Sequence, residues 1–587
     1  MMKRLNLITG VLSAIVAAWA AIKMSQQQFW LHLPLVLFLG AWISFMLLID
    51  NFWIKNPQTK KHFFLSALSG ILLSVGFPPY DLTPLLFVGF VPLFYIQQEC
   101  NQNKTSSFWY IYNAFVLWNI YVTYWVANAA LIPGIVAIWL NSLFMLVPWY
   151  LSEFVSRKTP ILKGVAFICF WCSFEFLHLH WEISWPWLNL GNAWSALPSW
   201  IQWYEYTGTF GGTIWILILN VVIFNLFFNK FQIGFSSFYK IFNSPTKKFL
   251  LVSLLIFIPL CISLLRYSNY LPTGKYGEVC VVQPNYEPHY EKFTVPEMDQ
   301  ITRLGRLAET ACNENTKFIV FPETCFGDSG GPIRSDKVSS DNRIILFYDF
   351  VESHFNIPIV MGLTTVTFLN ELSESKFKRT NPRTKQSYEI ANSSVILKDR
   401  METVKVYNKS KLVPGAEIFP YRDYLPFLLP LVNKLGGSTA GLATQSVRNV
   451  FESQGYKIAP IICYESIYGD YMRGFANNGA GAIFVMTNDG WWDDTPGYKQ
   501  HMAYSKLRAI ELRKPVVRSA NTGISCFINS KGEVTKQTEY GVMASITDSV
   551  SFSDETTFYT KYGDFIAYIA LIISALIIFF SIGKRFF

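Results

Sequence analysis

Charged residues are scarce in this sequence: Asp, Glu, Lys and Arg make up 15% of the 587 residues, whereas 51% are hydrophobic and 17% aromatic. So few charges exclude an ordinary soluble protein of this length. The charges are also uneven, because most fall between about residues 273 and 560, while long uncharged runs fill residues 5–267 and 565–582. The sequence therefore predicts a membrane domain, a large polar domain and a closing membrane anchor.

Several classes of site are excluded by what is missing. The seven His are scattered, and no Cys or His spacing resembles a zinc site, so we expect no metal and no other cofactor. The nine Cys follow no framework spacing, which argues against a disulfide scaffold. "CFWC" at 169–172 has redox spacing, but it lies inside an apolar run, where we expect helix packing. The net charge of +9 comes largely from loops between apolar runs, so it implies no nucleic-acid partner.

Ten apolar runs approach the roughly 20 residues that span a bilayer. They lie at about residues 5–22, 31–50, 63–79, 82–98, 108–128, 132–154, 162–180, 210–229, 248–267 and 565–583. Every second connecting loop carries Lys or Arg, so the positive-inside rule predicts cytoplasmic termini and a polar domain on the outer side. The basic and then apolar start also fits a cleaved signal peptide, but the apolar run that follows directly favours an uncleaved first span.

In the polar domain, short apolar runs alternate with segments of helical spacing. Strands are predicted at 277–285, 317–324, 357–366, 388–398, 457–463 and 480–489, and helices at 298–312 and 498–514. This order is typical of a layered α/β domain, in which polar residues at strand ends line the site. Three strand ends carry such residues, namely Glu323, Cys463, and the pair Asn488 and Asp489. Pro460 lacks an N–H, so its strand should be irregular or lie at a sheet edge there.

Motifs in both halves of the sequence resemble those of one known family. "FIVFPET", "YNKSKLVPGAEIFP" and "IICYES" are similar to the Glu, Lys and Cys motifs of the nitrilase superfamily. Three further segments narrow the resemblance to the apolipoprotein N-acyltransferases of bacterial inner membranes. They are "GFPPYDLTPLLFVGFVPL" (76–93), "SWPWLNLGNAW" (184–194) and "NDGWWDDTPGYKQHMAYSKLRAIELRKPVVRSANTGIS" (488–525). The resemblance covers about residue 60 to the C-terminus, so the first two apolar runs look additional to the family's usual eight.

This resemblance implies a multi-pass α-helical membrane domain joined to an extracytoplasmic α/β nitrilase-like domain, which is an α-β-β-α sandwich. We expect extra N-terminal spans at 1–55, a membrane helical domain at 56–270, a periplasmic catalytic domain at 271–562 and a C-terminal anchor at 563–587. The expected location is the bacterial inner (cytoplasmic) membrane, with both termini in the cytoplasm.

The resemblance also implies a reaction. An acyl chain would pass from a glycerophospholipid to the α-amino group of the N-terminal diacylglyceryl-Cys of a lipoprotein, by a ping-pong mechanism through a thioester on Cys463. Glu323 would act as general base, and Lys409 would stabilise the oxyanion together with a backbone N–H near Tyr464. The partners would be a phospholipid donor, a lipoprotein acceptor and membrane lipids, with no metal or nucleic acid.

Other residues are expected to support this chemistry. Glu417 lies shortly after Lys409 and would hold its ammonium charged, and Tyr464 and Glu465 flank the nucleophile. Family members often carry a Trp shortly after the first strand of the outer domain. Phe293 stands near that place here, and with Trp491 it is a candidate for contact with lipid.

Two other functions fit parts of the sequence. A membrane-tethered nitrilase or amidase would use the same Glu, Lys and Cys to hydrolyse a C–N bond, although ten spans exceed what an anchor needs. A non-catalytic transporter or receptor would leave the three ordered motifs unexplained, and the paired broken segments of an inverted repeat are missing.

The outer end of the predicted membrane domain is rich in aromatic and ionisable residues. Segment 181–209 contains Trp181, Trp185, Trp187, Trp194, Trp200 and Trp203, a composition that favours an interfacial belt over substrate contact. Glu175 and His178 fall within a predicted span, where ionisable groups are functional candidates by default. Glu205 lies just before the next apolar run, so solvation at the membrane interface explains its presence there as well as a functional role does.

Overall fold

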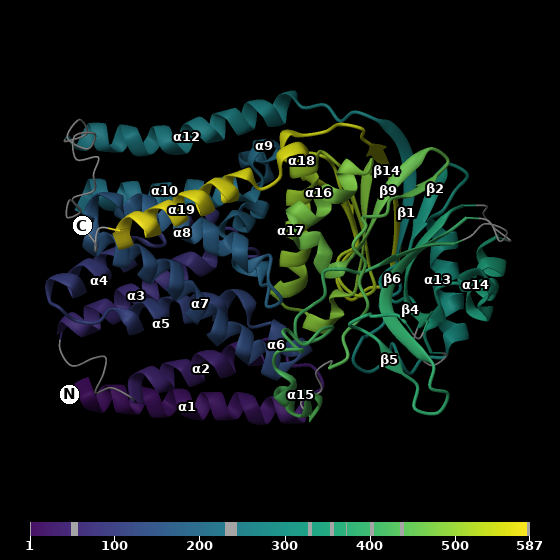
Figure 1. Ribbon diagram of the computed structural model, residues 1–587, viewed down its shortest axis with the longest axis horizontal. Coiled ribbons are helices and arrows are strands. Elements are labelled where there is room, and N and C mark those ends of the chain that lie inside the picture. The colour runs from purple at the N-terminus through teal and green to yellow at the C-terminus, as the bar shows by residue number, and fades with distance from the viewer. Residues whose placement is uncertain are drawn as a thin grey trace.

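The structure is a computed structural model that describes residues 2–48, 57–228, 244–326, 331–352, 357–370, 372–398, 404–434 and 439–583. A helical bundle occupies the described chain up to residue 269, and a sheet domain follows over residues 275–562. Figure 1 shows the bundle on one side and the sheets on the other, with α19 returning into the bundle. The expected boundary between residues 55 and 56 lies outside the described residues.

The bundle contains helices of different length and hydropathy. They are α1 (Met2–Gln26), α2 (Leu33–Leu48), α3 (Pro57–Val75), α4 (Val91–Gln102), α5 (Phe108–Thr123), α6 (Val126–Ala129), α7 (Leu131–Lys158), α8 (Lys163–His178), α9 (Tyr204–Thr207), α10 (Thr209–Phe228), α12 (Pro245–Asn269) and α19 (Phe565–Gly583). Of the helices that the structure describes, α1 from Arg4 onward, α7, α10, α12 and α19 are long and apolar enough to cross a bilayer. The chain is therefore that of a membrane protein.

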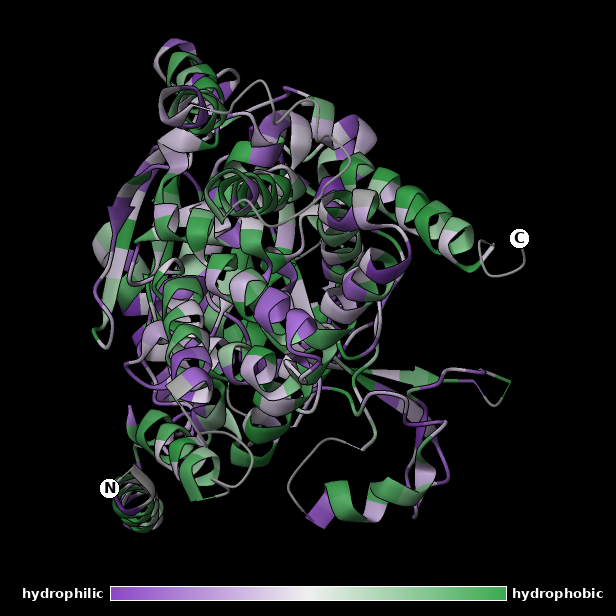
Figure 2. Cartoon of the chain, turned by 90° about the vertical axis from the view of Figure 1, so that its left-hand side faces the viewer, coloured by the Kyte–Doolittle hydropathy of each residue, from purple (hydrophilic) through white to green (hydrophobic). Residues whose placement is uncertain are grey.

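The periphery of the bundle is apolar, as a lipid-facing surface must be. In Figure 2, α19, which leads to the C-terminus, lies at the edge of the bundle and is hydrophobic along most of its length. Its exposed side chains include Ile572 and Phe579, which are 62% and 79% exposed. Lipid tails can cover such side chains, whereas water would disfavour them.

One expected span, at 82–98, is not a single helix. The 3-10 helix η1 (Thr83–Val88) ends at Gly89, and α4 begins only at Val91. Pro84 and Pro92 each stand in the first turn of the element they open, where the missing N–H costs nothing. The prediction of a continuous span here was wrong, because two prolines each start a new helix.

The interfacial interpretation of segment 181–209 was wrong for Trp187 and Trp194, which are 2% and 0% exposed. The segment forms η3 (Pro186–Leu188), η4 (Leu190–Ala196) and η5 (Pro198–Trp200), which turn it back into the protein. Trp194 stacks on Trp215 of α10 with ring centroids 4.7 Å apart, and Trp187 packs against Trp125 at 4.7 Å. These rings form part of the joint between the bundle and the sheet domain.

The sheet domain contains two sheets. The first has the order β14-β1-β2-β4-β6-β5, with β3 paired to β4 and β7 to β6, and the second has the order β13-β12-β11-β10-β9-β8. The strands are β1 (Lys275–Gln283), β2 (Thr316–Val320), β3 (Ile333–Arg334), β4 (Ile359–Leu369), β5 (Arg379–Thr380), β6 (Ser387–Leu397), β7 (Lys405–Asn408), β8 (Phe451–Ser453), β9 (Tyr456–Ile462), β10 (Ala482–Thr487), β11 (Val516–Ala520), β12 (Cys526–Ile528), β13 (Val534–Gln537) and β14 (Ala544–Phe552). All six predicted strands are present.

Helices cover the outer face of each sheet. They are α13 (Glu297–Ala311) and α14 (Asn342–Glu352) on the first sheet, and α16 (Gly469–Asn477) and α17 (Pro496–Leu512) on the second, while η7 (Val338–Ser340), η8 (Pro426–Leu428), α15 (Leu429–Lys434), η9 (Cys463–Ile467), η10 (Asp489–Trp492) and α18 (Phe558–Tyr562) are short. Along β1, Val279 and Val281 belong to the core between the sheets, whereas Cys280 and Val282 pack with α13 and α14. The α-β-β-α sandwich is confirmed, and Figure 1 shows α16 and α17 between the second sheet and the bundle.

The strand that leads to Cys463 bears out the expectation for Pro460. β9 pairs with β10 through Pro460, but β8 pairs only with Tyr456 to Ile458 of β9. Among the described strands, β9 is therefore an edge at Pro460. The missing N–H breaks no hydrogen bond there.

Candidate active site

Glu323 follows β2 at a place where β4 passes unusually close. A Cβ added to Gly362 would lie 2.7 Å from the Cα of Glu323, so only glycine allows this approach. The Glu323 Oε1 atom accepts hydrogen bonds from Asn392 Nδ2 at 2.7 Å and from Lys409 Nζ at 3.1 Å. Within the described chain no side chain donates to its Oε2 atom. This oxygen is therefore available to take a proton.

Lys409 follows β7 and is only 1% exposed. Its Nζ atom donates to Glu323 Oε1 and, at 2.8 Å, to Glu417 Oε1. Glu417 is itself held by the backbone N–H of Val413, which donates to Oε2 at 2.8 Å. Burial alone would lower the pKa of Lys409, but the carboxylates of Glu323 and Glu417 outweigh it and raise the pKa well above the ordinary value. The ammonium stays charged. Glu323, Lys409 and Glu417 are called the front network below.

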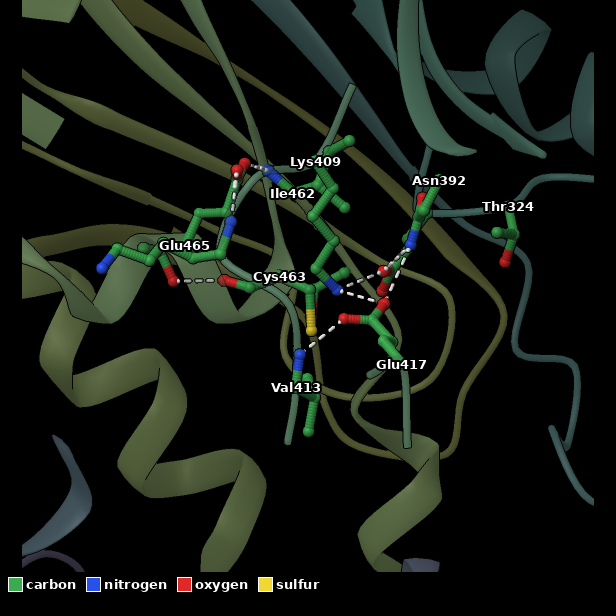
Figure 3. Close-up of polar contacts among 12 residues, drawn as sticks. Thr324, Asn392, Lys409, Val413, Glu417, Ile462, Cys463 and Glu465 are labelled. Atoms are coloured by element: carbon green, nitrogen blue, oxygen red, sulfur yellow. Dashed lines mark hydrogen bonds and ion pairs between the residues drawn. The ribbon is translucent and has the colours of Figure 1, made fainter. Parts of the chain in front are cut away.

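Cys463 stands where β9 ends and η9 begins, with a φ of 49°. A non-glycine residue in this left-handed region forms a sharp strand-to-helix turn, which presents the side chain at the end of the sheet. Figure 3 shows its sulfur pointing toward the ammonium of Lys409 and the carboxylate of Glu417. Burial and the Glu323 charge raise the pKa of the Cys463 thiol, while Lys409 opposes them. At rest this side chain is therefore a thiol, which would need a base before it could act as a nucleophile.

Glu465 does not reach the ammonium of Lys409 but holds the two loops together. Its Oε1 atom accepts hydrogen bonds from the N–H of Ser410 at 2.7 Å and from Tyr407 at 2.6 Å, and its Oε2 atom accepts from the N–H of Ile462 at 2.9 Å. It thus fixes the turn at Cys463 against the loop that carries Lys409. Tyr464 points the other way, and its hydroxyl donates to the carbonyl of Ser184 at 3.0 Å.

A second set of buried charges lies against the backbone of Cys463. The Cys463 carbonyl accepts hydrogen bonds from His501 Nε2 at 3.1 Å and from Ser466 Oγ at 2.8 Å. His501 Nδ1 lies 2.9 Å from Asp489 Oδ1, and Arg518 Nη2 donates to Asp489 Oδ2 at 2.6 Å. Burial would raise the pKa of Asp489, but Arg518 and His501 lower it to about 2. Asp489, His501 and Arg518 are called the rear network below.

The sequence indicated only part of the rear network. Asp489 was recognised as a polar strand end, but it was expected to line the site rather than to lie behind the nucleophile. His501 and Arg518 were missed. The available signal was the spacing of His501 within a predicted helix, which places it on the side of α17 that packs on η9.

The two predicted lipid contacts are not brought to the front network. Phe293 is 44% exposed, and Trp491 packs its ring against His289 at 5.1 Å. The neighbour of Phe293, Lys292, is instead buried, and its Nζ donates to the carbonyl of Glu323 at 3.2 Å and to Thr324 Oγ1 at 2.6 Å. Lys292 thus holds the backbone of Glu323, a role that sequence reasoning missed.

The ionisable residues near the outer end of the bundle have structural contacts. Glu175 accepts hydrogen bonds from the N–H of Leu190 at 2.9 Å and from Thr213 at 2.7 Å, so it ties η4 to α10. His178 is buried and stacks on Phe174, with ring centroids 5.2 Å apart. Glu205 is 3% exposed, so interfacial solvation does not explain it. It pairs with Arg266 and Arg513.

The region that the structure describes contains no group of three or more His, Cys, Asp or Glu side chains placed to hold a metal ion. The side chains gathered at Cys463 are a thiol, the carboxylate of Glu323 and the fixed ammonium of Lys409. These groups suit acyl transfer through a thioester.

Comparisons with known proteins identify the family of the chain. The family model for the apolipoprotein N-acyltransferase N-terminal domain matches residues 69–222, and that for carbon-nitrogen hydrolases matches residues 279–553. The apolipoprotein N-acyltransferase of Chlorobaculum tepidum is 27% identical over 541 residues, which are 90% of this chain and 98% of that protein. Those of Geobacter metallireducens and Pasteurella multocida are each 24% identical over 87% of this chain, covering 93% and 94% of their own lengths. This chain therefore belongs to the apolipoprotein N-acyltransferase family, a family of acyltransferases, and its C-terminal half has the carbon-nitrogen hydrolase fold.

Proposed function

We propose that this protein transfers an acyl chain from a glycerophospholipid to the α-amino group of the N-terminal diacylglyceryl-Cys of lipoproteins, through a thioester on Cys463. Its membership of the family supports N-acylation of lipoproteins in general. The donor and the intermediate are inferred from the site. The observation that supports this donor and this intermediate is that the buried thiol of Cys463 lies beside the Glu323 carboxylate and the Lys409 ammonium, at the end of the sheet domain next to the bundle.

Contacts between the active-site loops and the bundle support a lipid donor. The Lys411 ammonium donates to the carbonyl of Leu179 just beyond α8, and Tyr464 donates to Ser184. A Cβ on Gly415, in the loop between Lys409 and Glu417, would lie 3.5 Å from Pro133 of α7. A lipid ester at the membrane surface would therefore lie only a short distance from Cys463.

The first half-reaction consumes the donor ester. Cys463 Sγ attacks the carbonyl carbon while Glu323 takes the thiol proton. The tetrahedral oxyanion is stabilised by the Lys409 ammonium and by the N–H of Tyr464, one of the first N–H groups of η9, which have no acceptor within that helix. Collapse breaks the ester C–O bond, and Glu323 gives its proton to the departing glycerol oxygen. A lysophospholipid leaves, and the acyl chain stays on sulfur.

The second half-reaction forms the amide. The neutral α-amine of the lipoprotein attacks the thioester carbonyl, and the same ammonium and N–H stabilise the oxyanion. Glu323 accepts the proton that the amine sheds and returns it to the sulfur as the C–S bond breaks. Donor and acceptor react in turn, so the kinetics are ping-pong.

This reaction also sets the proposed topology. We propose that the protein resides in the bacterial inner membrane with the sheet domain in the periplasm and both termini in the cytoplasm, as the distribution of basic loops supports. The proposed division is extra spans at 1–55, a membrane domain at 56–270, a catalytic domain at 271–562 and an anchor at 563–587.

The test is the intact mass of the purified full-length protein after incubation with a phospholipid. We expect a gain of one acyl chain that hydroxylamine removes and that Cys463→Ala abolishes. Cys261→Ala is the matched control, because Cys261 is an exposed thiol elsewhere in the chain, and its removal should leave the adduct intact. A folded protein that consumes phospholipid without any adduct, releasing free fatty acid, would favour hydrolysis over transfer.

A further inference from the structure

A cavity of about 410 Å³ lies where three bundle helices meet the sheet domain. The bundle contributes Leu179 and His180 beyond α8, Thr209 at the start of α10, and Asp564 just before α19. The sheet domain contributes α16 and two segments that carry Lys411 and Arg448. Such a volume is typical of a small-molecule site.

This cavity is separate from the front network. None of Glu323, Lys409 and Cys463 lines it. Tyr468 forms part of its wall, and Tyr464, whose ring packs on Tyr468 at 5.2 Å, lies between that wall and the nucleophile. A molecule in the cavity would not contact the reacting atoms.

Four cationic side chains line the cavity, and two of them have carboxylate partners. Arg473 pairs with Asp470 at 2.8 Å, and Arg508 pairs with Glu511 at 2.7 Å. Lys411 and Arg448 form no ion pair within the described chain. They donate to backbone carbonyls, Lys411 to that of Leu179 at 3.3 Å and Arg448 to that of Ser446 at 2.9 Å. They also lie over aromatic rings, at 4.6 Å from the ring centroid of Tyr468 and 3.8 Å from that of Tyr471.

The two unpaired cations repel one another. Burial lowers the pKa of Lys411, and the charge of Arg448 lowers it further, while Asp470 and Glu465 only partly compensate. The cavity thus holds an excess of positive charge that an anion would relieve. An Arg and a Lys set in one wall are the usual ligands of a phosphate group.

The position of the cavity identifies the source of the phosphate. α10 and α19 are both long and apolar enough to cross a bilayer, and the cavity opens at the ends of these helices next to the sheet domain. This is the depth of the head groups. Leu177 on α8 and Tyr568 on α19, which are close in sequence to the lining residues Leu179 and Asp564, have exposed side chains that acyl chains could contact.

We propose that this cavity binds the phosphate of a membrane phospholipid between Lys411 and Arg448, as a second lipid site that is distinct from the acyl-donor site at Cys463. The lipid holds the sheet domain against the ends of α8, α10 and α19. It is not consumed in the reaction.

The test is native mass spectrometry of the full-length Cys463→Ala protein, which cannot turn lipid over. The probes are soluble dihexanoyl phosphatidylglycerol, dihexanoylglycerol without phosphate, and inorganic phosphate. We expect the phosphatidylglycerol to occupy one more site than dihexanoylglycerol does. Adding Lys411→Gln and Arg448→Gln together should weaken this site at least tenfold, whereas Lys457→Gln, an exposed lysine on β9, should leave it unchanged.

A further variant separates charge from packing. Arg448→Lys keeps the positive charge and should weaken binding less than Arg448→Gln, and thermal unfolding of each variant shows whether it is folded. Undiminished binding by the folded double variant would overturn the proposal. Binding of inorganic phosphate as tight as that of the lipid would overturn it as well, because the cavity would then be a site for free anions.

Discussion

Cys463 lies between two buried networks of charged side chains that are built from similar residues and touch different atoms. In the front network, one cation, Lys409, is shared by the carboxylates of Glu323 and Glu417. In the rear network, one carboxylate, Asp489, is shared by Arg518 and His501. The front network faces the sulfur, whereas the rear network reaches only the carbonyl oxygen of Cys463.

This difference assigns the networks different tasks. In the proposed reaction, the front network would exchange a proton with the sulfur and stabilise an oxyanion, because its charges lie beside the sulfur. The rear network fixes a residue whose φ of 49° is unfavourable by about 1 to 3 kcal/mol for a side chain other than glycine. Burial and charge alone therefore do not distinguish a catalytic group from a positioning group. The atoms that each group contacts do.

The largest effect should come from removing the cation of the front network. We expect Lys409→Met to lower the rate of acyl transfer by about 10²- to 10³-fold, because the oxyanion loses its charged donor. The measurement is single-turnover transfer to a peptide that begins with diacylglyceryl-Cys. Lys405→Met, at the exposed start of β7, is the matched control. A variant that keeps a tenth of the native rate would contradict the role given to Lys409.

The rear network should matter through geometry. We expect His501→Ala to lower kcat by roughly 10- to 100-fold, since a small displacement of the nucleophile costs this much, and to leave KM nearly unchanged. It should also lower stability by about 1 to 3 kcal/mol, because buried polar partners are left unsatisfied.

A conservative variant distinguishes positioning by His501 from a purely structural role. His501→Gln can still donate to the Cys463 carbonyl, so it should recover more of kcat than of the thermal stability. Equal recovery of both would mean that His501 acts only in folding.

The sequence was sufficient to predict the strands that precede Glu323 and Cys463, but not β7, which precedes Lys409. Apolar runs locate β2, β9 and β10. The strands β9 and β10 are parallel neighbours that end at one edge of the second sheet, whereas β2 belongs to the first sheet, so the meeting of Glu323 with Cys463 depends on how the two sheets pack. What it missed are partners that arrive from distant segments. Asn392 is 69 residues from Glu323, and His501 is 38 residues from Cys463. Such contacts depend on the packing of two sheets and a helix, which no local pattern encodes.

The membrane half shows the same limit more strongly. A Trp-rich segment between two apolar runs has the composition of an interfacial belt, yet Trp194 and Trp187 are buried because 3-10 turns bring the segment back into the protein. Glu175 was likewise predicted to be a functional candidate, because it is an ionisable residue within a predicted span. Its three hydrogen-bond donors, on α8, η4 and α10, become evident only in three dimensions.

The two networks should differ in how strongly they change the pH dependence of Cys463 alkylation. Glu323 raises the pKa of Cys463 more than Asp489 does, and Lys409 lowers it. A nearby carboxylate disfavours the thiolate, so Glu323→Gln should move alkylation of Cys463 by iodoacetamide to lower pH. Asp489→Asn should move it less in the same direction, and Lys409→Met should move it to higher pH.

The measurement is the carboxamidomethylation rate of the Cys463 peptide as a function of pH. Free N-acetylcysteine in the same reaction is the reference, and its profile should be the same with every variant. Equal shifts in Glu323→Gln and Asp489→Asn would mean that both networks act on the sulfur alike, and the distinction between them would fail.

The smallest effect should come from the hydroxyl of Thr487, which contacts both Asp489 and Cys463. Thr487 Oγ1 donates its proton to Asp489 Oδ1 at 2.8 Å, and its contact with the Cys463 side chain lowers the pKa of the thiol. Thr487→Val keeps the shape but removes both contacts, so we expect a loss of about 1 kcal/mol, which is roughly fivefold in rate. Thr487→Ser retains the hydroxyl and should remain near native. Combined with His501→Ala, an additive loss would show that the networks act on Cys463 independently. A loss smaller than the sum would mean that the rear network also acts on the sulfur, through Thr487.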